Sequence, residues 1–278
     1  MSSQLETPLA YCREKVASEG SSLHYATGFL PLEDRAFWLG LFALNQELRN
    51  ACMKQFEAGL TQIKLGWWRN TLANNEDNAN RHPVTVAISQ HVISSIPPEH
   101  WEALIEAVVS SCEAKRFNHQ VDWDNTLKTE IRPWLPLMTA RTGIDDTHAL
   151  LAFWVASTQV CQVLRLAKYL DSQFQPIPIS LLQQHGVTAE QFRLRQHDEK
   201  TTALFQAVMH ARIDAAHAAW HAMPVALRLF CRPLRALFRM RLAEFRLHSP
   251  HLLLLTEQKC LTPLRKFCTA WTTHVLRR

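Results

Sequence analysis

The sequence predicts an all-α fold, and three observations support this prediction. Glycine is scarce, with only 7 in 278 residues. Alternating β-branched runs are few, whereas residues with high helix propensity, such as Ala, Leu, Gln, Glu and Arg, are abundant. Helical signals recur from one end of the chain to the other. With 47% apolar residues and no visible repeat or linker, we expect one domain over residues 1–278.

The first long helix is expected to begin at Pro31. Proline suits the first helical position, and Glu33 and Asp34 would lie near the positive end of the helix dipole. The helix should continue through Trp38 into the stretch "ALNQELRNACMK" (residues 43–54), whose apolar residues recur at steps of four and three. This pattern predicts that one face of the helix lies in the core.

Polar breaks separate this helix from the next ones. Residues 72–84 are expected to form a polar loop, and Pro97 and Pro98 mark a second break with a helix start after it. The helix that follows is amphipathic, because four of its less polar residues fall on one side. These residues are Leu104, Ala107, Val108 and Cys112.

A long apolar helix is expected after Gly143, which suits a C-cap. Asp145 and Asp146 resemble part of a metal motif, but they come just before the helix, so we expect them to cap it. A further capped helix is expected to start at Thr188. In an earlier segment Trp67 and Trp68 are adjacent, so they cannot both face inward on one helix.

Charge and cysteine content exclude several classes of protein. The formal net charge of +5 is compatible with an anionic ligand or a membrane surface, but it is too small to indicate nucleic-acid binding. The 7 cysteines form no C-x-x-C pair, and their odd number favours a reducing compartment. The N-terminal stretch lacks an apolar signal core, and no segment approaches the roughly 20 apolar residues of a membrane span. We expect a cytoplasmic or peripheral protein.

Four ordered motifs resemble the squalene/phytoene synthase superfamily. They are "SSLHYATGFLPLEDRAFWLGLFALNQEL", "WWRNTL", "HPVTVAI" and "PISLLQQHGVT". The positions that match the pattern are Ser22, Pro31, Arg35, Trp68, Arg69, His82, Pro83, Pro178, Gly186 and Val187. The resemblance implies a squalene/phytoene-synthase-like helical bundle around a central apolar cavity. It also makes four residues candidates for ligand binding, namely Ser22, His24, Arg35 and Asn45.

Active members of that superfamily carry two acidic motifs, D-x-x-x-D and D-x-x-E-D. Carboxylates four residues apart lie on one helix face, and two opposed faces hold Mg²⁺ against a prenyl diphosphate. Here the first motif is replaced by Arg49, Asn50 and Met53, and the second by Arg165, Lys168 and Tyr169. A cation repels the metal but binds an anionic headgroup directly. We therefore expect no catalytic residue, no bound metal and no cofactor.

The replacements resemble one branch of the superfamily, which contains the mitochondrial respiratory complex I assembly factor. "ALNQEL", "TARTGID", "QVLRLA" and "ISLLQQHGVT" are similar to that branch, as is the C-terminal "LTPLRKFCTAWTTHVLRR". The resemblance implies a role in assembly of a respiratory complex at the inner membrane. It does not imply prenyl transfer.

Three hypotheses for function follow. The first is a non-catalytic protein that binds an apolar or isoprenoid-like ligand, or a partner subunit, and assists assembly of a respiratory complex. The second is a divergent prenyl transferase that condenses prenyl diphosphates head to head with Mg²⁺ and uses Glu47, Asp171 or other acids. The third is an interaction protein that works through a basic stripe and the C-terminal tail.

Three further side-chain patterns have competing interpretations. His210, Asp214, His217 and His221 share one helical face, for which we favour a solvated surface over a metal site. A basic stripe has two interpretations. It contacts anionic lipid or an acidic partner, or it is the exposed face of a core helix that is kinked or interrupted at Pro233. The stripe consists of Arg228, Arg232, Arg235, Arg239 and Arg246. An apolar line in the tail is expected to dock on the protein's own bundle, with a membrane or another protein as alternatives. It consists of Leu264, Phe267, Trp271 and Val275.

Overall fold

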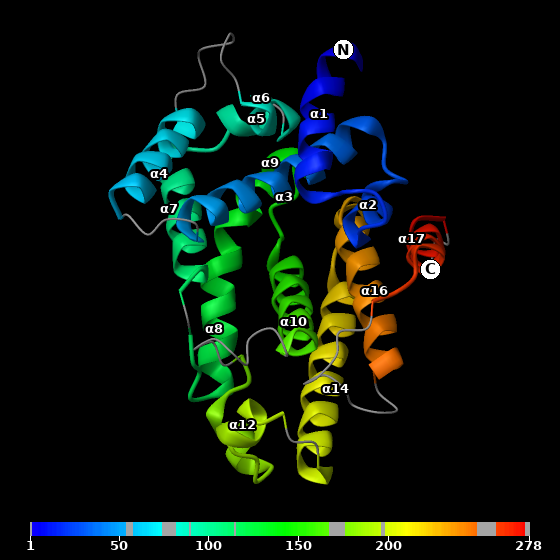
Figure 1. The fold of residues 1–278 in the computed structure, drawn as a ribbon. Coiled ribbons are helices and arrows are strands. Elements are labelled where there is room, and N and C mark those ends of the chain that lie inside the picture. The colour runs from blue at the N-terminus through cyan, green and yellow to red at the C-terminus, as the bar shows by residue number, and fades with distance from the viewer. Residues whose placement is uncertain are drawn as a thin grey trace.

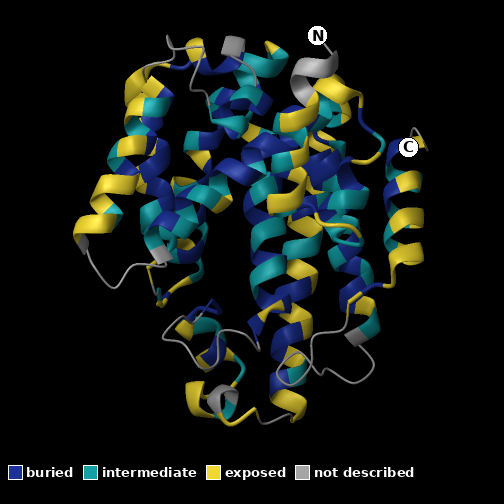
Figure 2. Ribbon diagram, turned by 45° about the horizontal axis from the view of Figure 1, so that its top comes forward, coloured by how far each residue is buried: buried dark blue, intermediate teal, exposed yellow. Residues whose placement is uncertain are grey.

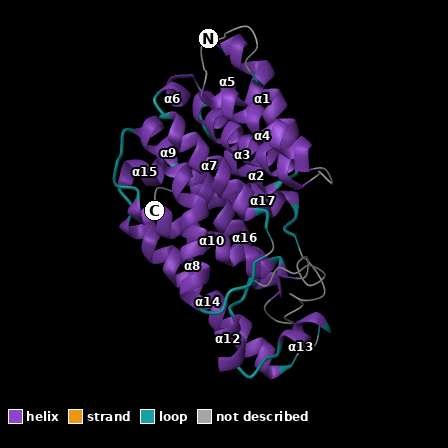
Figure 3. Cartoon of the chain, turned by 90° about the vertical axis from the view of Figure 1, so that its left-hand side faces the viewer, coloured by secondary structure: helices purple, strands orange, loops and turns teal. Residues whose placement is uncertain are grey.

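The computed structural model describes residues 2–53, 58–73, 82–88, 90–113, 115–166, 176–195, 198–248 and 260–275. Within these ranges the secondary structure is helical and contains no β-strand (Figure 3), which confirms the all-α prediction. The elements are α1 (Ser2–Val16), α2 (Ser22–Thr27), α3 (Leu32–Met53), α4 (Ala58–Ala73), α5 (Pro83–Ile88), α6 (Gln90–Ser94), α7 (Pro98–Ser111), α8 (Gln120–Ile131), the 3₁₀ turn η2 (Arg132–Trp134), α9 (Leu135–Thr142), α10 (His148–Leu164), α12 (Ile179–Gln184), α13 (Ala189–Arg193), α14 (Glu199–Ala222), α15 (Val225–Phe230), α16 (Arg232–His248) and α17 (Pro263–Val275).

Helix α3 crosses the upper half of the bundle in the view of Figure 1 and packs against α1, α4, α5 and α7. It begins at Leu32, directly after Pro31, and carries Glu33 and Asp34 in its first turn, as the sequence indicated. Its core side is fully buried over several turns, at Phe37, Trp38, Leu44 and Leu48 among others. The position of α3 therefore decides which side chains reach the interior.

A second layer is formed by α8, α10, α14 and α16. Helix α10 packs on all three of the others, and α10 and α14 lie side by side along their length (Figure 1). Buried residues from α1 through α16 belong to one continuous apolar cluster. None of the described helices is both long and apolar enough to cross a membrane.

The C-terminal helix α17 lies on the outside of the bundle, where it packs against α16 and α2 (Figure 1). The expected docking of the tail is therefore found, but only Phe267 of the expected face takes part in it, since its ring packs against Tyr25 and Phe29. Ala270 and His274 are the buried residues of α17. The apolar line of Leu264, Phe267, Trp271 and Val275 remains exposed, and exposed residues follow the outer side of this helix in Figure 2.

The expected helix ends are only partly confirmed. Gly143 ends α9 in the left-handed conformation, with φ of 69°, and Thr188 exchanges hydrogen bonds with Gln191 at the start of α13. The capping role of Asp145 and Asp146 is wrong, because the residue before α10 is Thr147 and no side chain caps it. The aspartates come too early to reach the free N–H groups of the first turn.

The adjacent tryptophans of α4 face opposite ways, as expected, since Trp68 is buried and Trp67 is exposed. The expected polar loop before α5 falls mostly outside the described residues. Helix α5 packs closely on α3 at Gly40, where a Cβ atom would lie 2.9 Å from Ile88 Cγ1 and 3.1 Å from Ala87 Cβ. The absence of a side chain at Gly40 therefore permits the contact between these two helices.

Replacing Gly40 with alanine is expected to destabilise the protein by about 1–3 kcal/mol, since the added methyl group overlaps with α5. The matched control is Gly66→Ala in α4, where no atom lies within 4 Å of the added Cβ. That change should stabilise the protein by up to about 1 kcal/mol through helix propensity. Urea unfolding of both variants measures the difference, and equal effects at the two positions would contradict the packing argument.

Candidate functional site

A small cavity lies among α3, α7, α8 and α10, next to the part of α3 that the resemblance aligns with the first acidic motif. Its volume is about 160 Å³, which is below the roughly 300–1,000 Å³ of ordinary small-molecule pockets. We call it the central cavity. Its lining consists of Leu41, Phe42, Asn45, Arg49, Ala107, Val108, Ser111, Glu130, Ile131, Trp134 and Trp154.

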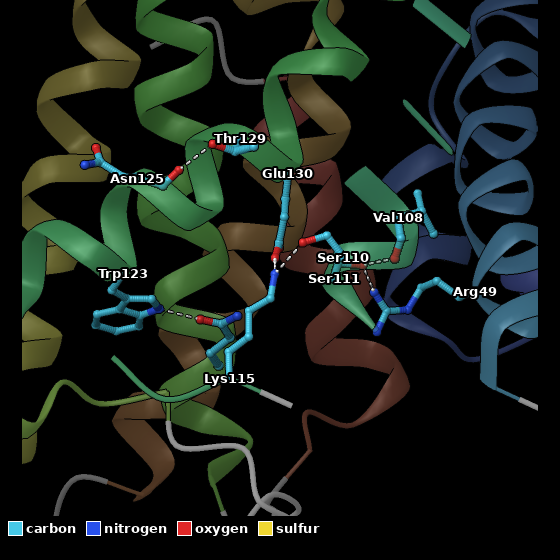
Figure 4. Close-up of polar contacts among 10 residues, drawn as sticks. Arg49, Val108, Ser110, Ser111, Lys115, Trp123, Asn125, Thr129 and Glu130 are labelled. Atoms are coloured by element: carbon cyan, nitrogen blue, oxygen red, sulfur yellow. Dashed lines mark hydrogen bonds and ion pairs between the residues drawn. The ribbon is translucent and has the colours of Figure 1, made fainter. Parts of the chain in front are cut away.

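Arg49 is the cation of this cavity. Its Nη1 donates a hydrogen bond of 2.9 Å to Ser111 Oγ, which in turn donates 2.8 Å to the carbonyl oxygen of Val108 (Figure 4). This chain joins α3 to the last turn of α7. Within the described part of the chain it is the only side-chain hydrogen bond of Arg49, so most of the guanidinium N–H groups remain available to another acceptor.

Glu130 is the only carboxylate among the described residues that line the cavity. Its Oε1 lies 2.5 Å from Lys115 Nζ, and Lys115 also donates 3.0 Å to Ser110 Oγ (Figure 4). The side chains of Lys115 and Glu130 are only 18% and 16% exposed. Separating a buried ion pair leaves each charge without a counter-charge, which is costly. Each side chain therefore holds the other in place.

The donor set of the central cavity does not fit Mg²⁺. This ion prefers octahedral oxygen ligands and is usually held by one or two carboxylates together with the phosphates of a substrate. Here the one carboxylate, Glu130, is neutralised by Lys115, and a second cation, Arg49, lines the same space. Among the described residues, no group of three or more His, Cys, Asp or Glu side chains is placed to hold a metal ion.

A second polar network joins α8, α10 and α14. Asp124 Oδ1 accepts 2.6 Å from Gln159 Nε2 and 2.8 Å from Gln120 Nε2, and it lies 3.4 Å from Arg212 Nη1. Gln159 is fully buried, so these contacts satisfy polar groups that water does not reach. The network holds the three helices together, and its carboxylate already has protein partners.

Glu47, the acid that the prenyl-transferase hypothesis invokes, faces α1 and not the cavity. Its Oε1 accepts 2.7 Å from the Tyr11 hydroxyl and lies 2.7 Å from Lys15 Nζ. Burial would raise the pKa of Glu47, but the hydrogen bonds from Lys15 and Tyr11 outweigh this effect and hold the pKa below its ordinary value. His82 lies edge-on to the Tyr11 ring, and burial lowers its pKa.

Of the four candidate ligand-binding residues, the structure brings only Asn45 to the central cavity. Ser22 is the first residue of α2, and the His24 ring packs edge-on against Tyr25. Arg35 donates 2.7 Å and 3.1 Å to the carbonyl oxygens of Gly28 and Leu30. These contacts give Arg35 a structural role, because they satisfy carbonyl groups at the end of α2.

The residues that replace the acidic motifs are also divided. Arg49 lines the cavity, whereas Asn50 accepts a hydrogen bond from Gln46 on an exposed part of α3. Met53 is the last residue of α3. Arg165, at the end of α10, is exposed and is not among the cavity residues. Lys168 and Tyr169 lie outside the described residues, as does Asp171.

The sequence interpretation missed Ser111, Lys115, Glu130 and Trp154. Ser111, Glu130 and Trp154 come from three different helices and Lys115 lies between α7 and α8, and their spacing along the chain carries no motif. Lys115 precedes α8 and Glu130 lies in its last turn, so no local sequence signal links the two. A pairing over that distance becomes visible only when α7 and α8 are packed together.

The histidine-bearing face of α14 is largely a solvated surface. His210, Asp214 and His221 are exposed, while His217 packs edge-on against Phe238. This arrangement agrees with the interpretation that was favoured for these residues. The basic stripe is interrupted as expected, since α15 ends at Phe230 and α16 begins at Arg232.

Comparison with known proteins gives one family match. The model of the family described as squalene/phytoene synthase matches residues 16–265. Two curated relatives are each 22% identical over 275 residues, which cover 94% of this chain and 81% of the relative. They are the proteins described as NADH dehydrogenase (ubiquinone) complex I, assembly factor 6, from Homo sapiens and from Bos taurus.

Two solved structures share the fold. A dehydrosqualene synthase in complex with ligand has a TM-score of 0.75 at 12% identity, covering 98% of this chain and 96% of that chain. Squalene synthase HpnC from Alicyclobacillus acidocaldarius has a TM-score of 0.65 at 18% identity, covering 89% of this chain and 96% of that chain. The expected squalene/phytoene-synthase-like bundle is therefore confirmed.

The Glu47→Gln variant is expected to be less stable than the wild type at pH 7 by about 1–3 kcal/mol, since it loses charge-assisted hydrogen bonds. The folded-state pKa of Glu47 is depressed, so its contribution is present above the unfolded pKa of about 4.3 and is lost as the pH falls through the folded pKa. Between about pH 5 and pH 3 the wild type should therefore lose more stability than the variant.

Urea unfolding at a series of pH values measures this effect. Glu14→Gln is the control, because Glu14 is an exposed glutamate of the neighbouring α1, and its effect should stay within about 0.5 kcal/mol. Parallel pH curves for the wild type and Glu47→Gln would show that Glu47 has no special stabilising role.

Proposed function

The chain belongs to the squalene/phytoene synthase family, and from this premise we propose that it is a non-catalytic member that assists the assembly of a respiratory membrane complex. In this role it binds a partner subunit or an apolar, isoprenoid-like molecule and does not condense prenyl diphosphates. The proposal does not include the metal-dependent ionisation of a diphosphate that the family's acidic motifs imply.

One observation carries the non-catalytic part of the proposal, which is the charge of the central cavity. Arg49 lines it, and its one carboxylate, Glu130, is paired with Lys115. A site that promotes departure of a diphosphate through Mg²⁺ needs free carboxylates to hold the metal. A cavity with excess positive charge favours an anion and disfavours a divalent cation.

The size of the cavity bears on what it binds. A volume of about 160 Å³ is too small to enclose a long prenyl chain by the standard of ordinary ligand pockets. An isoprenoid-like ligand would therefore require the helices around Trp134 and Trp154 to separate. This consideration favours a partner protein over an enclosed prenyl ligand.

The assembly part of the proposal comes from the two relatives named as complex I assembly factors, which align over 94% of this chain. We infer a similar task here, with subunits of a respiratory complex as partners. The proposed location is the cytoplasmic side of an inner membrane. Peripheral contact there would use Arg228, Arg232, Arg235 and Arg239.

The alternative is a divergent prenyl transferase that uses acids other than the family's motifs. Glu47 is a weak candidate for this chemistry, because Lys15 and Tyr11 already bind its carboxylate and it faces α1. Asp171 lies outside the described residues. The assay described next separates this alternative from the proposed function.

Purified protein incubated with Mg²⁺ and either farnesyl or geranylgeranyl diphosphate is expected to yield no condensation product. The physical reason is that, in the described part of the chain, no set of free carboxylates lines the central cavity to hold the metal. Extracted products are measured by gas chromatography with mass detection, with an active dehydrosqualene synthase as the positive control. Product formed by this protein above a boiled sample would establish the prenyl-transferase alternative.

Deleting the gene in its native host is expected to lower the amount of assembled respiratory complex I, measured on native gels and as NADH oxidation by membranes. Wild-type protein supplied from a plasmid should restore both. The Glu14→Gln variant, supplied from the same plasmid, is the control and should restore both as well as the wild type does. An unchanged amount of complex I after deletion would contradict the assembly role. It would not bear on catalysis, which the incubation with prenyl diphosphates tests.

A further inference from the structure

A groove of about 1070 Å³ lies on the surface far along the chain from the central cavity, between the end of α14, α15, the start of α16 and the last turn of α17. We call it the arginine groove, because four arginines line it. These are Arg228, Arg232, Arg235 and Arg239. The other lining residues are Trp220, His221, Val225, Leu229, Thr272, Thr273, His274 and Val275.

Among the residues that the structure describes, the positive charge of the arginine groove has no counter-charge. Its lining contains neither Asp nor Glu, and in the described part of the chain none of the four arginines forms an ion pair. The polar partners that do exist are neutral or basic side chains. Arg239 donates 2.9 Å to Thr273 Oγ1, and Arg235 Nη2 lies 3.4 Å from His217 Nδ1.

Two guanidinium nitrogens at this groove, Arg228 Nε and Arg235 Nη1, are buried and have no hydrogen-bond partner among the described residues. Burying a charged donor without an acceptor is costly, so such groups in a folded protein point to a missing acceptor. The guanidinium carbon of Arg235 lies 5.1 Å from the centre of the Trp220 ring. This contact holds the guanidinium group against the indole ring, and both residues line the groove.

The electrostatic environment agrees with this geometry. Burial, with the charge of Arg239 added, lowers the pKa of Arg235 to about 10. Burial and the charge of Arg246 also lower the pKa of Arg239. Like charges therefore repel one another at the floor of the groove, and a bound anion would relieve this repulsion.

The rim of the groove is apolar. Val225, Leu229 and Val275 are 62%, 48% and 50% exposed. Six of the 13 large apolar side chains that are exposed in the described chain lie on α15 or α17. Guanidinium groups match the oxygens of a phosphate in paired hydrogen bonds, while an exposed apolar rim is suited to a hydrocarbon chain. The two features together indicate an amphiphile with a phosphate group.

We propose that the arginine groove binds the phosphate-bearing headgroup of an anionic lipid, with the lipid chain lying over Val225, Leu229 and Val275. The proposal deepens the peripheral membrane contact suggested above, and it rests on that part of the proposed function. It is independent of whether the central cavity is catalytic. An acidic peptide would satisfy the arginines equally well, but it would leave the apolar rim exposed.

The test measures binding of the full-length protein to vesicles of phosphatidylcholine with and without phosphatidic acid. The wild type is expected to bind the vesicles that contain phosphatidic acid and to bind pure phosphatidylcholine much more weakly. Arg228→Gln and Arg232→Gln should each weaken binding about tenfold, since each removes a charge-assisted contact. Arg232→Lys keeps the charge and should lose less.

Arg13→Gln is the control for net charge, because Arg13 is exposed on α1, away from the groove, and it should change binding by less than about twofold. An equal loss in this control would overturn the proposal, as would equal binding to both kinds of vesicle. Two competitors decide the source of the anion. Arginine-dependent binding of inorganic phosphate or of hexaglutamate, without vesicle binding, would overturn the lipid assignment in favour of a free anion or an acidic peptide.

These outcomes are distinct from those that test the proposed function. A prenyl product would eliminate the non-catalytic role without affecting the arginine groove. Loss of vesicle binding in the arginine variants would in turn say nothing about the central cavity. Circular dichroism and thermal unfolding of each variant establish that the helices are intact before its binding is compared with that of the wild type.

Discussion

A charged side chain in the interior of a helical bundle is stable only where another group of the protein satisfies it, and this constraint shapes the molecule around α3. The helix buries Leu44 and Leu48 yet carries Glu47 and Arg49 on either side of them. Glu47 is satisfied by α1, through Lys15 and Tyr11. Arg49 makes one hydrogen bond at the end of α7, to Ser111. The two contacts fix the rotation of α3 about its own axis, and they therefore decide which residues face the cavity.

The same constraint explains how a bundle of this family keeps its shape with different charges inside. The apolar cluster that runs from α1 to α16 makes most of the contacts between helices, so the packing does not depend on the residues that line the cavity. Near the cavity Glu130 is matched by Lys115, and in the adjoining network Asp124 is matched by Gln120, Gln159 and Arg212. Once each carboxylate has a partner from the protein, it no longer competes for a metal ion.

Much of the fold could be predicted from sequence, because its signals are local. The proline before α3 and the acidic residues of its first turn, the prolines at the start of α7 and the glycine after α9 each act within one turn of a helix. The buried face of α17 could not be predicted in this way. Its apolar line suggested docking through large side chains, but the small Ala270 of α17 and Ala236 of α16 are both fully buried in one cluster. Small residues let two helices approach closely, and this effect depends on a partner that lies far away in sequence.

The candidate site shows the same division. Asn45 and Arg49 were indicated by their place on α3, whereas Ser111, Glu130 and Trp154 come from three other helices. Ser22, His24 and Arg35 belong to a motif of the family, yet they support α2 and the turn that follows it. A motif reports that residues occur together, but the packing of the helices decides which of them share a cavity.

The close approach of α3 and α5 has a consequence for how the family can diverge. Because a Cβ atom at position 40 would meet both Ala87 and Ile88, these three positions behave as one unit. A larger residue at position 40 becomes tolerable only with a shorter side chain at position 88 or a shifted α5. Homologues that lack glycine here should therefore show a compensating change on α5, so that the pair of helices would appear as correlated substitutions in a deep alignment.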